Sequence, residues 1–154
     1  MSTLNIRPVV TDDIPHLKAV ITTSDLFPAD LLDDMIAPYL VGEDESIWLT
    51  GHGDQPTFVA FCAPEQMTEG TWNLYLIAVY ADLQSKGYGR QIMAHLENQL
   101  ANQGARILLV ETSGLPEFER TRSFYHQVGY TEEARIRDFY KAGEDKVVFW
   151  KKLK

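Results

Sequence analysis

The sequence predicts an α/β (α+β) fold built on a mixed, mostly antiparallel central sheet. Two observations lead to this prediction. The first half of the chain reads as one strand, two helices and then three strands, and the turns between these strands are short enough for antiparallel pairing. The last third alternates strand-like and helix-like segments and ends in two strands around a turn, which adds a β-α-β-α part.

Changes in hydrophobic period place the elements of the first half. We expect a short strand within residues 4–10 and a helix from about Asp12, with Thr11 as its N-cap. A second helix is expected over residues 29–40, bent near Pro38. Two strand-like runs, 46–50 and 57–62, flank the turn GHGDQP, and this arrangement predicts a hairpin.

The second half begins with the apolar run NLYLIAVY, which starts at Asn73 and predicts a buried strand. A glycine turn and a helix that ends near Gly104 follow it. The remaining expected elements are a strand over 106–112, a helix over 117–127, and two strands over 130–140 and 146–153.

Length and composition predict a single domain over residues 1–154. A chain of 154 residues that is 45% hydrophobic can build one substantial core. The only cysteine, Cys62, excludes an internal disulfide and cannot form a zinc site alone, which suits a reducing compartment. No stretch approaches the roughly 20 apolar residues of a membrane span, and the first residues lack a signal-peptide pattern. We therefore expect a cytoplasmic protein with no membrane partner and no metal.

The charge balance narrows the class of partner. A formal net charge of -8 argues against general nucleic-acid binding and favours a cationic partner such as an amine. The chain also contains Trp48, Trp72 and Trp150, which would support protein association if they formed one exposed patch. Oligomeric state cannot be read from the pattern, and we expect a homodimer because this is the commonest homo-oligomer.

The turn after the apolar strand carries the pattern Q-x-x-G-x-G, formed by Gln84, Gly87 and Gly89. A strand that feeds a glycine turn at the start of a helix points several backbone N–H groups at one spot, and the helix dipole adds positive charge there. Glycines also let a ligand approach the main chain closely. The turn therefore predicts a phosphate or pyrophosphate site. A P-loop is not expected, because no G-K-[ST] follows the glycines.

This pattern, placed after a strand that ends in A-V-Y, resembles the acetyl-CoA loop of the GCN5-related N-acetyltransferase (GNAT) superfamily. A second signature, F-Y-x-x-x-G-Y from Phe124 to Tyr130, is similar to the family's short helix and following glycine. The order of elements matches over nearly the whole chain. The resemblance implies an acyl-CoA N-acyltransferase fold with helices flanking the sheet, and transfer of an acetyl group from acetyl-CoA to an amine.

The resemblance also implies cofactor contacts. Three strand residues match those whose backbone pairs with the pantetheine arm of acetyl-CoA: Ile77, Ala78 and Val79. Seven residues match the loop that binds the pyrophosphate: Gln84, Ser85, Lys86, Gly87, Tyr88, Gly89 and Arg90. The alternative is a glycine turn that only connects the strand to the helix.

Two catalytic candidates follow from the same resemblance. Tyr125 matches the tyrosine that donates a proton to the leaving thiolate, although it could instead be a core aromatic residue. Many relatives place a glutamate base in the central strand, and here that strand has no acidic residue; Asn73 or Tyr75 could at best hold a water. Relatives that acetylate protein N-termini use a glutamate in the next strand, near the place of Glu111. Glu111 could also be a salt-bridged surface residue.

The resulting hypothesis is direct attack of a primary amine on acetyl-CoA in a ternary complex, with a small or amino-acid-like acceptor. Two alternatives stay open. The chain could acetylate protein N-termini, or it could bind acyl-CoA as a regulatory module without turnover.

Overall fold

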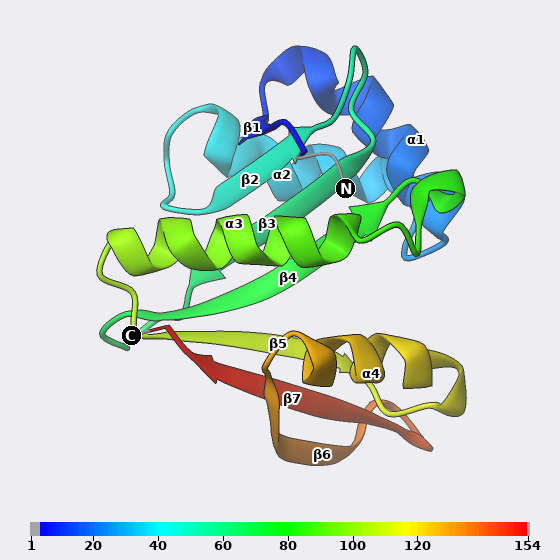
Figure 1. Ribbon diagram of the computed structural model, residues 1–154, viewed down its shortest axis with the longest axis vertical. Helices are drawn as coiled ribbons and strands as arrows, with labels where there is room; N and C mark the ends of the chain where they lie inside the picture. Colours follow the sequence, from blue (N-terminus) through cyan, green and yellow to red (C-terminus); the bar gives the residue numbers. More distant parts are fainter. Residues whose placement is uncertain (1–3, 154) are drawn as a thin grey trace. The chain divides into compact units, whose positions relative to one another are not determined.

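The computed structural model of the chain describes residues 4–153 and divides into two compact units (Figure 1). The first unit comprises Met1–Ala63 and Tyr75–Leu96, and the second comprises Pro64–Leu74 and Glu97–Lys154. The strands follow the order β1-β2-β3-β4-β5-β7-β6 in one seven-stranded sheet. The predicted α/β (α+β) class with a mixed, mostly antiparallel sheet is confirmed.

The first unit contains three antiparallel strands and two helices: β1 (Ile6–Pro8), β2 (Ile47–Gly51), β3 (Phe58–Pro64), α1 (Ile14–Ser24) and α2 (Leu32–Leu40). β2 pairs with both β1 and β3, so the predicted hairpin is present. Each helix is preceded by one turn of 3-10 helix, at Thr11–Asp13 and Ala29–Leu31, which explains why the sequence placed the helix starts early.

The second unit contains three strands and one helix: β5 (Ile107–Ser113), β6 (Thr131–Lys141), β7 (Glu144–Lys152) and α4 (Glu119–Gln127). β7 pairs antiparallel with both β5 and β6. Three elements contribute residues to both units: β3, whose last residue Pro64 belongs to the second unit, β4 (Thr71–Val79) and α3 (Tyr88–Asn102). Over Thr71–Leu74, β4 runs parallel to β5, which supplies the parallel pair of the mixed sheet.

The core of the first unit forms where α1 and α2 meet the strands. Leu17 and Ile21 of α1 and Ile36 of α2 are fully buried in one cluster with Trp48 of β2. Trp48 is 1% exposed and stacks on Phe61 with 4.1 Å between ring centroids. The three tryptophans therefore do not form the exposed patch considered as an alternative, because Trp48 lies in the core.

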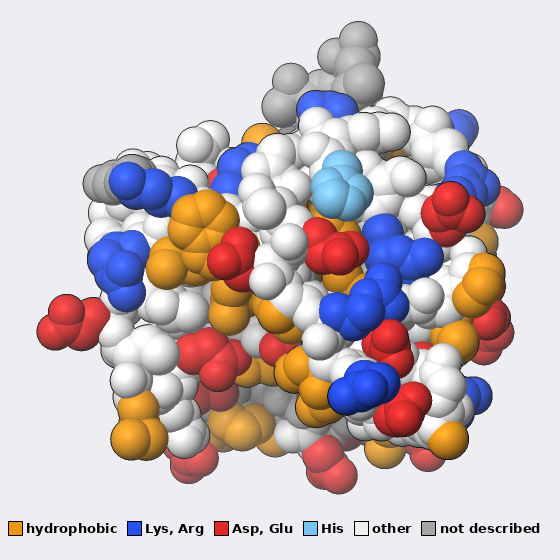
Figure 2. Space-filling view, turned by 90° about the horizontal axis from the view of Figure 1, so that it is seen from below, with side chains coloured by type: hydrophobic (Ala, Val, Ile, Leu, Met, Phe, Trp, Pro, Cys, Tyr) orange, Lys and Arg blue, Asp and Glu red, His pale blue; other side chains and the backbone are white. Residues whose placement is uncertain are grey.

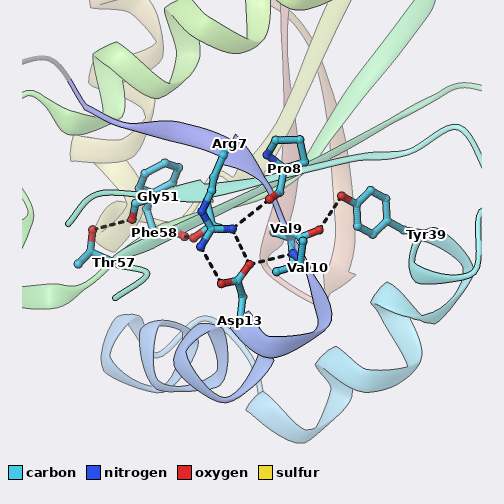
Figure 3. Close-up of polar contacts among 10 residues, drawn as sticks. Arg7, Pro8, Val9, Val10, Asp13, Tyr39, Gly51, Thr57 and Phe58 are labelled. Atoms are coloured by element: carbon cyan, nitrogen blue, oxygen red, sulfur yellow. Dashed lines mark hydrogen bonds and ion pairs between the residues drawn. The ribbon is translucent and has the colours of Figure 1, made fainter. Parts of the chain in front are cut away.

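Asp13, rather than the expected N-cap Thr11, holds the start of the first helical segment (Figure 3). Both carboxylate oxygens of Asp13 accept hydrogen bonds from Arg7 at 2.8 Å, and one of them also accepts the backbone N–H of Val10 at 2.8 Å. Asp13 is buried, and the guanidinium of Arg7 lowers the pKa of its carboxyl group. This residue therefore joins β1 to the helical segment that follows it.

The charges of the chain are mixed on the surface. On the face seen in Figure 2, lysine and arginine side chains are interspersed with aspartate and glutamate. The net charge of -8 therefore does not make this face uniformly acidic. Local contacts, rather than net charge, must decide where a cationic group binds.

Candidate active site

The Q-x-x-G-x-G loop has the strand-turn-helix form that the sequence predicts. β4 ends at Val79, a 3-10 turn covers Ala81–Leu83, and α3 begins at Tyr88. The side-chain amide of Gln84 donates a hydrogen bond of 3.0 Å to the carbonyl of Val79. This bond ties the loop back to the end of the strand, so the glutamine of the pattern has a structural role.

The two glycines of the loop serve different purposes. Gly87 has a φ of +83°, a left-handed conformation that strongly favours glycine. Gly89 instead lies in the first turn of α3, and its φ is not positive. What distinguishes Gly89 is the lack of a side chain at the helix start. Ser85 also has a left-handed conformation, with a φ of +65°, which the sequence did not predict.

The start of α3 fits a bound pyrophosphate. The backbone N–H groups of Tyr88, Gly89 and Arg90 lie in the first turn, where an α-helix supplies no i−4 carbonyl for them. Lys86 and Arg90 are exposed and add two positive charges. Donors, cations and the missing side chain at Gly89 together match the chemistry of a pyrophosphate group.

The predicted pantetheine-binding residues occupy the end of β4. Ala78 is buried, whereas Ile77 and Val79 are partly buried. The carbonyl of Val79 already accepts two hydrogen bonds of 3.0 Å, from the hydroxyl of Ser24 and from Gln84. The hydroxyl of Ser24 has one proton and also lies 2.9 Å from the carbonyl of Val20, so its bond to Val79 is shared. One lone pair of the Val79 carbonyl is therefore available to a ligand when Ser24 donates to Val20.

A buried asparagine joins two carboxylates beside β5. Asn73 of β4 is 2% exposed, and its Nδ2 donates to Glu111 Oε2 at 2.9 Å and to Glu65 Oε1 at 3.0 Å. Among the described residues, Asn73 Oδ1 is a buried acceptor with no hydrogen-bond partner. The central strand lacks a glutamate, yet two carboxylates from its neighbours converge on it. Glu65 was not predicted from the sequence, because it lies in a turn and has no recognisable spacing to Asn73.

Glu111 is held from its other side by Lys146 of β7. The ammonium Nζ lies 3.1 Å from Glu111 Oε1 and 3.9 Å from the centre of the Phe139 ring. Glu111 therefore receives hydrogen bonds from a neutral amide and from an ammonium group. Glu111 forms the salt bridge that was considered as the alternative to a base. Its partners Asn73 and Lys146 lie on the two neighbouring strands, β4 and β7.

Tyr125 of α4 is 3% exposed and packs among aromatic rings. Its ring centroid lies 5.2 Å from that of Phe124, 5.5 Å from Phe149 and 5.8 Å from Tyr130. Burial raises the pKa of the Tyr125 hydroxyl above its ordinary value of 10.0. The phenol is consequently held in its protonated form, as a proton or hydrogen-bond donor requires.

The strand register places the two catalytic candidates on different faces. Phe149, which contacts Tyr125, is the register partner of Val110 on β5. Glu111 follows Val110, and successive side chains of a strand point to opposite faces. Glu111 thus shares one face with Asn73 and Lys146, whereas Tyr125 packs on the other.

An arginine holds the segment between β5 and α4. Arg122 Nη1 of α4 donates to the carbonyl of Ser113 at 2.7 Å and to that of Leu115 at 2.9 Å. Gly114 donates its backbone N–H to the carbonyl of Asp145. Arg122 was not singled out in the sequence, because an arginine in a charged helix carries no signal of its own.

Comparison with known proteins decides the family. Residues 40–132, more than half of the chain, match the family model described as an acetyltransferase (GNAT) domain. The chain belongs to the GNAT acetyltransferase family. It is an N-acetyltransferase of this family, whose members generally transfer acetyl groups from acetyl-CoA to amines.

Solved structures of the GNAT family are similar over almost the whole chain. A protein from Desulfovibrio desulfuricans, described as a GNAT-family acetyltransferase, has a TM-score of 0.89 and 29% identity, covering 99% of this chain and 100% of that one. Ribosomal-protein-S18-alanine N-acetyltransferase from Escherichia coli has a TM-score of 0.78 and 21% identity, covering 99% and 95%. An aminoglycoside 6′-N-acetyltransferase complexed with coenzyme A has a TM-score of 0.78 and 14% identity, covering 97% of each chain. The last two establish the fold. No curated protein sequence matched this GNAT chain.

Two further features of this GNAT chain concern residues 4–153. Within that range, no three His, Cys, Asp or Glu side chains gather as a metal site would need. None of the helices described there has the length and apolar character of a membrane span.

Proposed function

We propose that this GNAT enzyme transfers the acetyl group of acetyl-CoA to the primary amine of a small or amino-acid-like molecule, by direct attack in a ternary complex. The observation that carries the proposal is the loop of residues 84–90, which opens α3 with first-turn N–H groups that have no i−4 carbonyl in the helix, and with two cations. These features suit the pyrophosphate of acetyl-CoA. The backbone of Ile77, Ala78 and Val79 would bind the pantetheine arm.

Glu111 is the proposed general base. An amine acceptor is mostly ammonium at neutral pH and must lose a proton before attack. Glu111 already binds one primary ammonium group, that of Lys146, at 3.1 Å, so its oxygens are suited to bind another. Asn73 would hold the Glu111 carboxylate in place while the proton moves.

Tyr125 is the proposed donor to the leaving thiolate. Its raised pKa keeps the hydroxyl protonated, and it also makes complete proton transfer to a thiolate less favourable. A hydrogen bond that stabilises the thiolate is therefore the larger part of its proposed role. Glu111 and Tyr125 are proposed to make separate contacts, one with the attacking amine and one with the leaving group.

Acetylation of protein N-termini is the second candidate. It is supported by the position of Glu111 in β5, which resembles the base of relatives with that activity, and by the shared fold of the Escherichia coli alanine N-acetyltransferase. A regulatory module that binds acyl-CoA without turnover would lack activity with every acceptor.

Two measurements test the proposal. Calorimetric titration with acetyl-CoA should show binding, and thiol release should appear with members of a panel of small amines and N-terminal peptides. Release with small amines supports the first proposal, whereas release with peptides alone supports N-terminal acetylation. Binding without release supports the regulatory module, and no binding rules out the proposed loop.

The remaining expectations join this proposal. We propose one N-acetyltransferase domain over residues 1–154, since the family match at 40–132 spans parts of both units. A cytoplasmic homodimer is also proposed. It is supported by β6, which ends the strand order and whose eleven residues are all exposed, leaving its edge open to a second copy. Sedimentation equilibrium would measure the mass of the assembly, and a monomer at micromolar concentration would contradict the dimer.

A further inference from the structure

The proposed base of this enzyme is in contact with a primary amine of its own chain. Lys146 Nζ lies 3.1 Å from Glu111 Oε1, and its side chain is 12% exposed. The Phe139 ring, 3.9 Å away, covers the ammonium group from another side. Lys146 thus has the contact that the mechanism requires of an acceptor: an ammonium nitrogen within hydrogen-bond distance of the base.

We propose that Lys146 is an acetyl acceptor of its own chain, so that the enzyme acetylates itself at this residue. The inference rests on the proposed function, because it uses acetyl-CoA as donor and Glu111 as base. It adds a modification site to the proposed reaction with external amines.

The reaction balances without any further reactant. Glu111 takes one proton from the Lys146 ammonium, and the nitrogen lone pair then attacks the thioester carbonyl carbon. A C–N bond forms, the C–S bond breaks, and the sulfur keeps the electron pair. The nitrogen loses two protons in total. One of them matches the proton that the thiolate takes up, and Glu111 passes the other to solvent.

Acetylation would change the surroundings of Glu111. The amide that replaces the ammonium carries no charge, so the ion pair with Glu111 is lost. Asn73 would still donate to Glu111 Oε2, and Oε1 would become open to the ammonium of an external acceptor. Self-acetylation therefore alters the same carboxylate that the proposed reaction uses.

Two other lysines provide matched comparisons. Lys151 lies 2.8 Å from Glu97 in a partly buried ion pair of similar geometry, but it has no contact with Glu111. Lys141 is 71% exposed beside Glu144, so it is the more accessible amine for uncatalysed reaction with acetyl-CoA. Chemical acetylation alone should thus label Lys141 before Lys146, and a general effect of ion pairing should label Lys151 equally.

The test is a time course with isotope-labelled acetyl-CoA, followed by peptide mass spectrometry. We expect label on Lys146 at a rate about tenfold or more above that on Lys141 and Lys151, as general base catalysis allows. The reaction would take place within one molecule, between its bound acetyl-CoA and its own Lys146. The first-order rate should therefore not change when the protein is diluted at saturating acetyl-CoA. Labelling of Lys146 no faster than of the two other lysines overturns the inference.

Two variants separate this inference from the proposed function. Glu111→Gln should reduce labelling of Lys146 to the level of Lys151, and Lys146→Arg should keep the ion pair but take no label. If external amines are acetylated while Lys146 stays unlabelled, self-acetylation is wrong and the proposed function stands. If Lys146 is labelled only when Glu111 is present and no external amine reacts, self-acetylation stands and the proposed transfer to external amines is wrong. If neither occurs, both are wrong.

Discussion

The side chains of Glu111 and Tyr125 lie on opposite faces of the strand pair formed by β5 and β7. Tyr125 packs on Phe149, whose register partner is Val110, and Glu111 is the next residue along β5. Direct attack on a thioester needs a base near the nucleophile and a donor near the leaving sulfur. Glu111 is proposed for the first contact and Tyr125 for the second.

Tyr125→Phe tests the proposed donor. The change removes one hydroxyl and keeps the ring that packs on Phe124, Tyr130 and Phe149. Turnover should fall about ten- to a thousandfold, while acetyl-CoA affinity stays the same. Steady-state thiol release and calorimetry measure the two quantities. Tyr130→Phe is a matched control, because it removes the hydroxyl of another buried tyrosine, which donates to Glu97. Equal losses in both variants would assign Tyr125 to the core.

Asn73→Leu tests whether the asparagine positions Glu111. The substitution keeps a similar volume but removes the donor that both carboxylates share. We expect a loss of about 1 to 3 kcal/mol in the free energy of unfolding, since two partly buried carboxylates lose the donor they share. The proposed base would also be less well held, so kcat should fall more than KM for acetyl-CoA changes.

The control for this variant is Asn98→Leu on the exposed face of α3. It should change neither stability nor kcat appreciably. A stability loss in Asn73→Leu with an unchanged kcat and pH profile would show that Asn73 is structural only.

The sequence predicted most elements because each has a clear local signal. The glycine turn after NLYLIAVY and the period of residues 29–40 were enough to place a strand end and a helix. Helix starts shifted by about one turn, because the 3-10 turns at Thr11–Asp13 and Ala29–Leu31 precede the α-helices and hold the residues from which the starts were predicted. These errors do not affect the proposed site.

The site was predictable only where the chain makes it locally. The residues of the 84–90 loop are consecutive, so their pattern is visible in the sequence. The group around Glu111 instead brings together Glu65, Asn73 and Lys146 from distant positions. No spacing rule connects them, because strand register, and not sequence distance, sets which side chains meet. Lys146 in particular reads as one more charged residue of a terminal strand.

Gly89→Val tests the proposed cofactor loop. A branched side chain would project from the first turn of α3, where the pyrophosphate is proposed to approach. Valine is no worse a helix former than glycine, so the fold should be kept. Calorimetry should therefore show no acetyl-CoA binding, with a circular dichroism spectrum like that of the wild type.

Ala94→Val is the control for this variant, because Ala94 is exposed on the same helix and away from its start. It should bind acetyl-CoA as the wild type does. Normal affinity in Gly89→Val would contradict the assignment of the loop.

Asp13→Asn tests the contact between β1 and the first helical segment, and it predicts a pH dependence. The Arg7 hydrogen bonds lower the pKa of Asp13 from its ordinary value of 3.8. A carboxyl group with a lower pKa in the folded state stabilises the fold above the unfolded-state value, and this contribution disappears as the pH falls through the folded-state value. Wild-type protein should thus lose stability below about pH 4.

Asp13→Asn should lose about 2 to 3 kcal/mol at pH 7 and show a smaller loss on acidification. Asp33→Asn, which removes the exposed ion pair with Lys18, should cost less than about 1 kcal/mol. Urea unfolding of the three proteins at pH 3 and pH 7 measures the difference, and parallel pH dependence in wild type and Asp13→Asn would contradict the assignment.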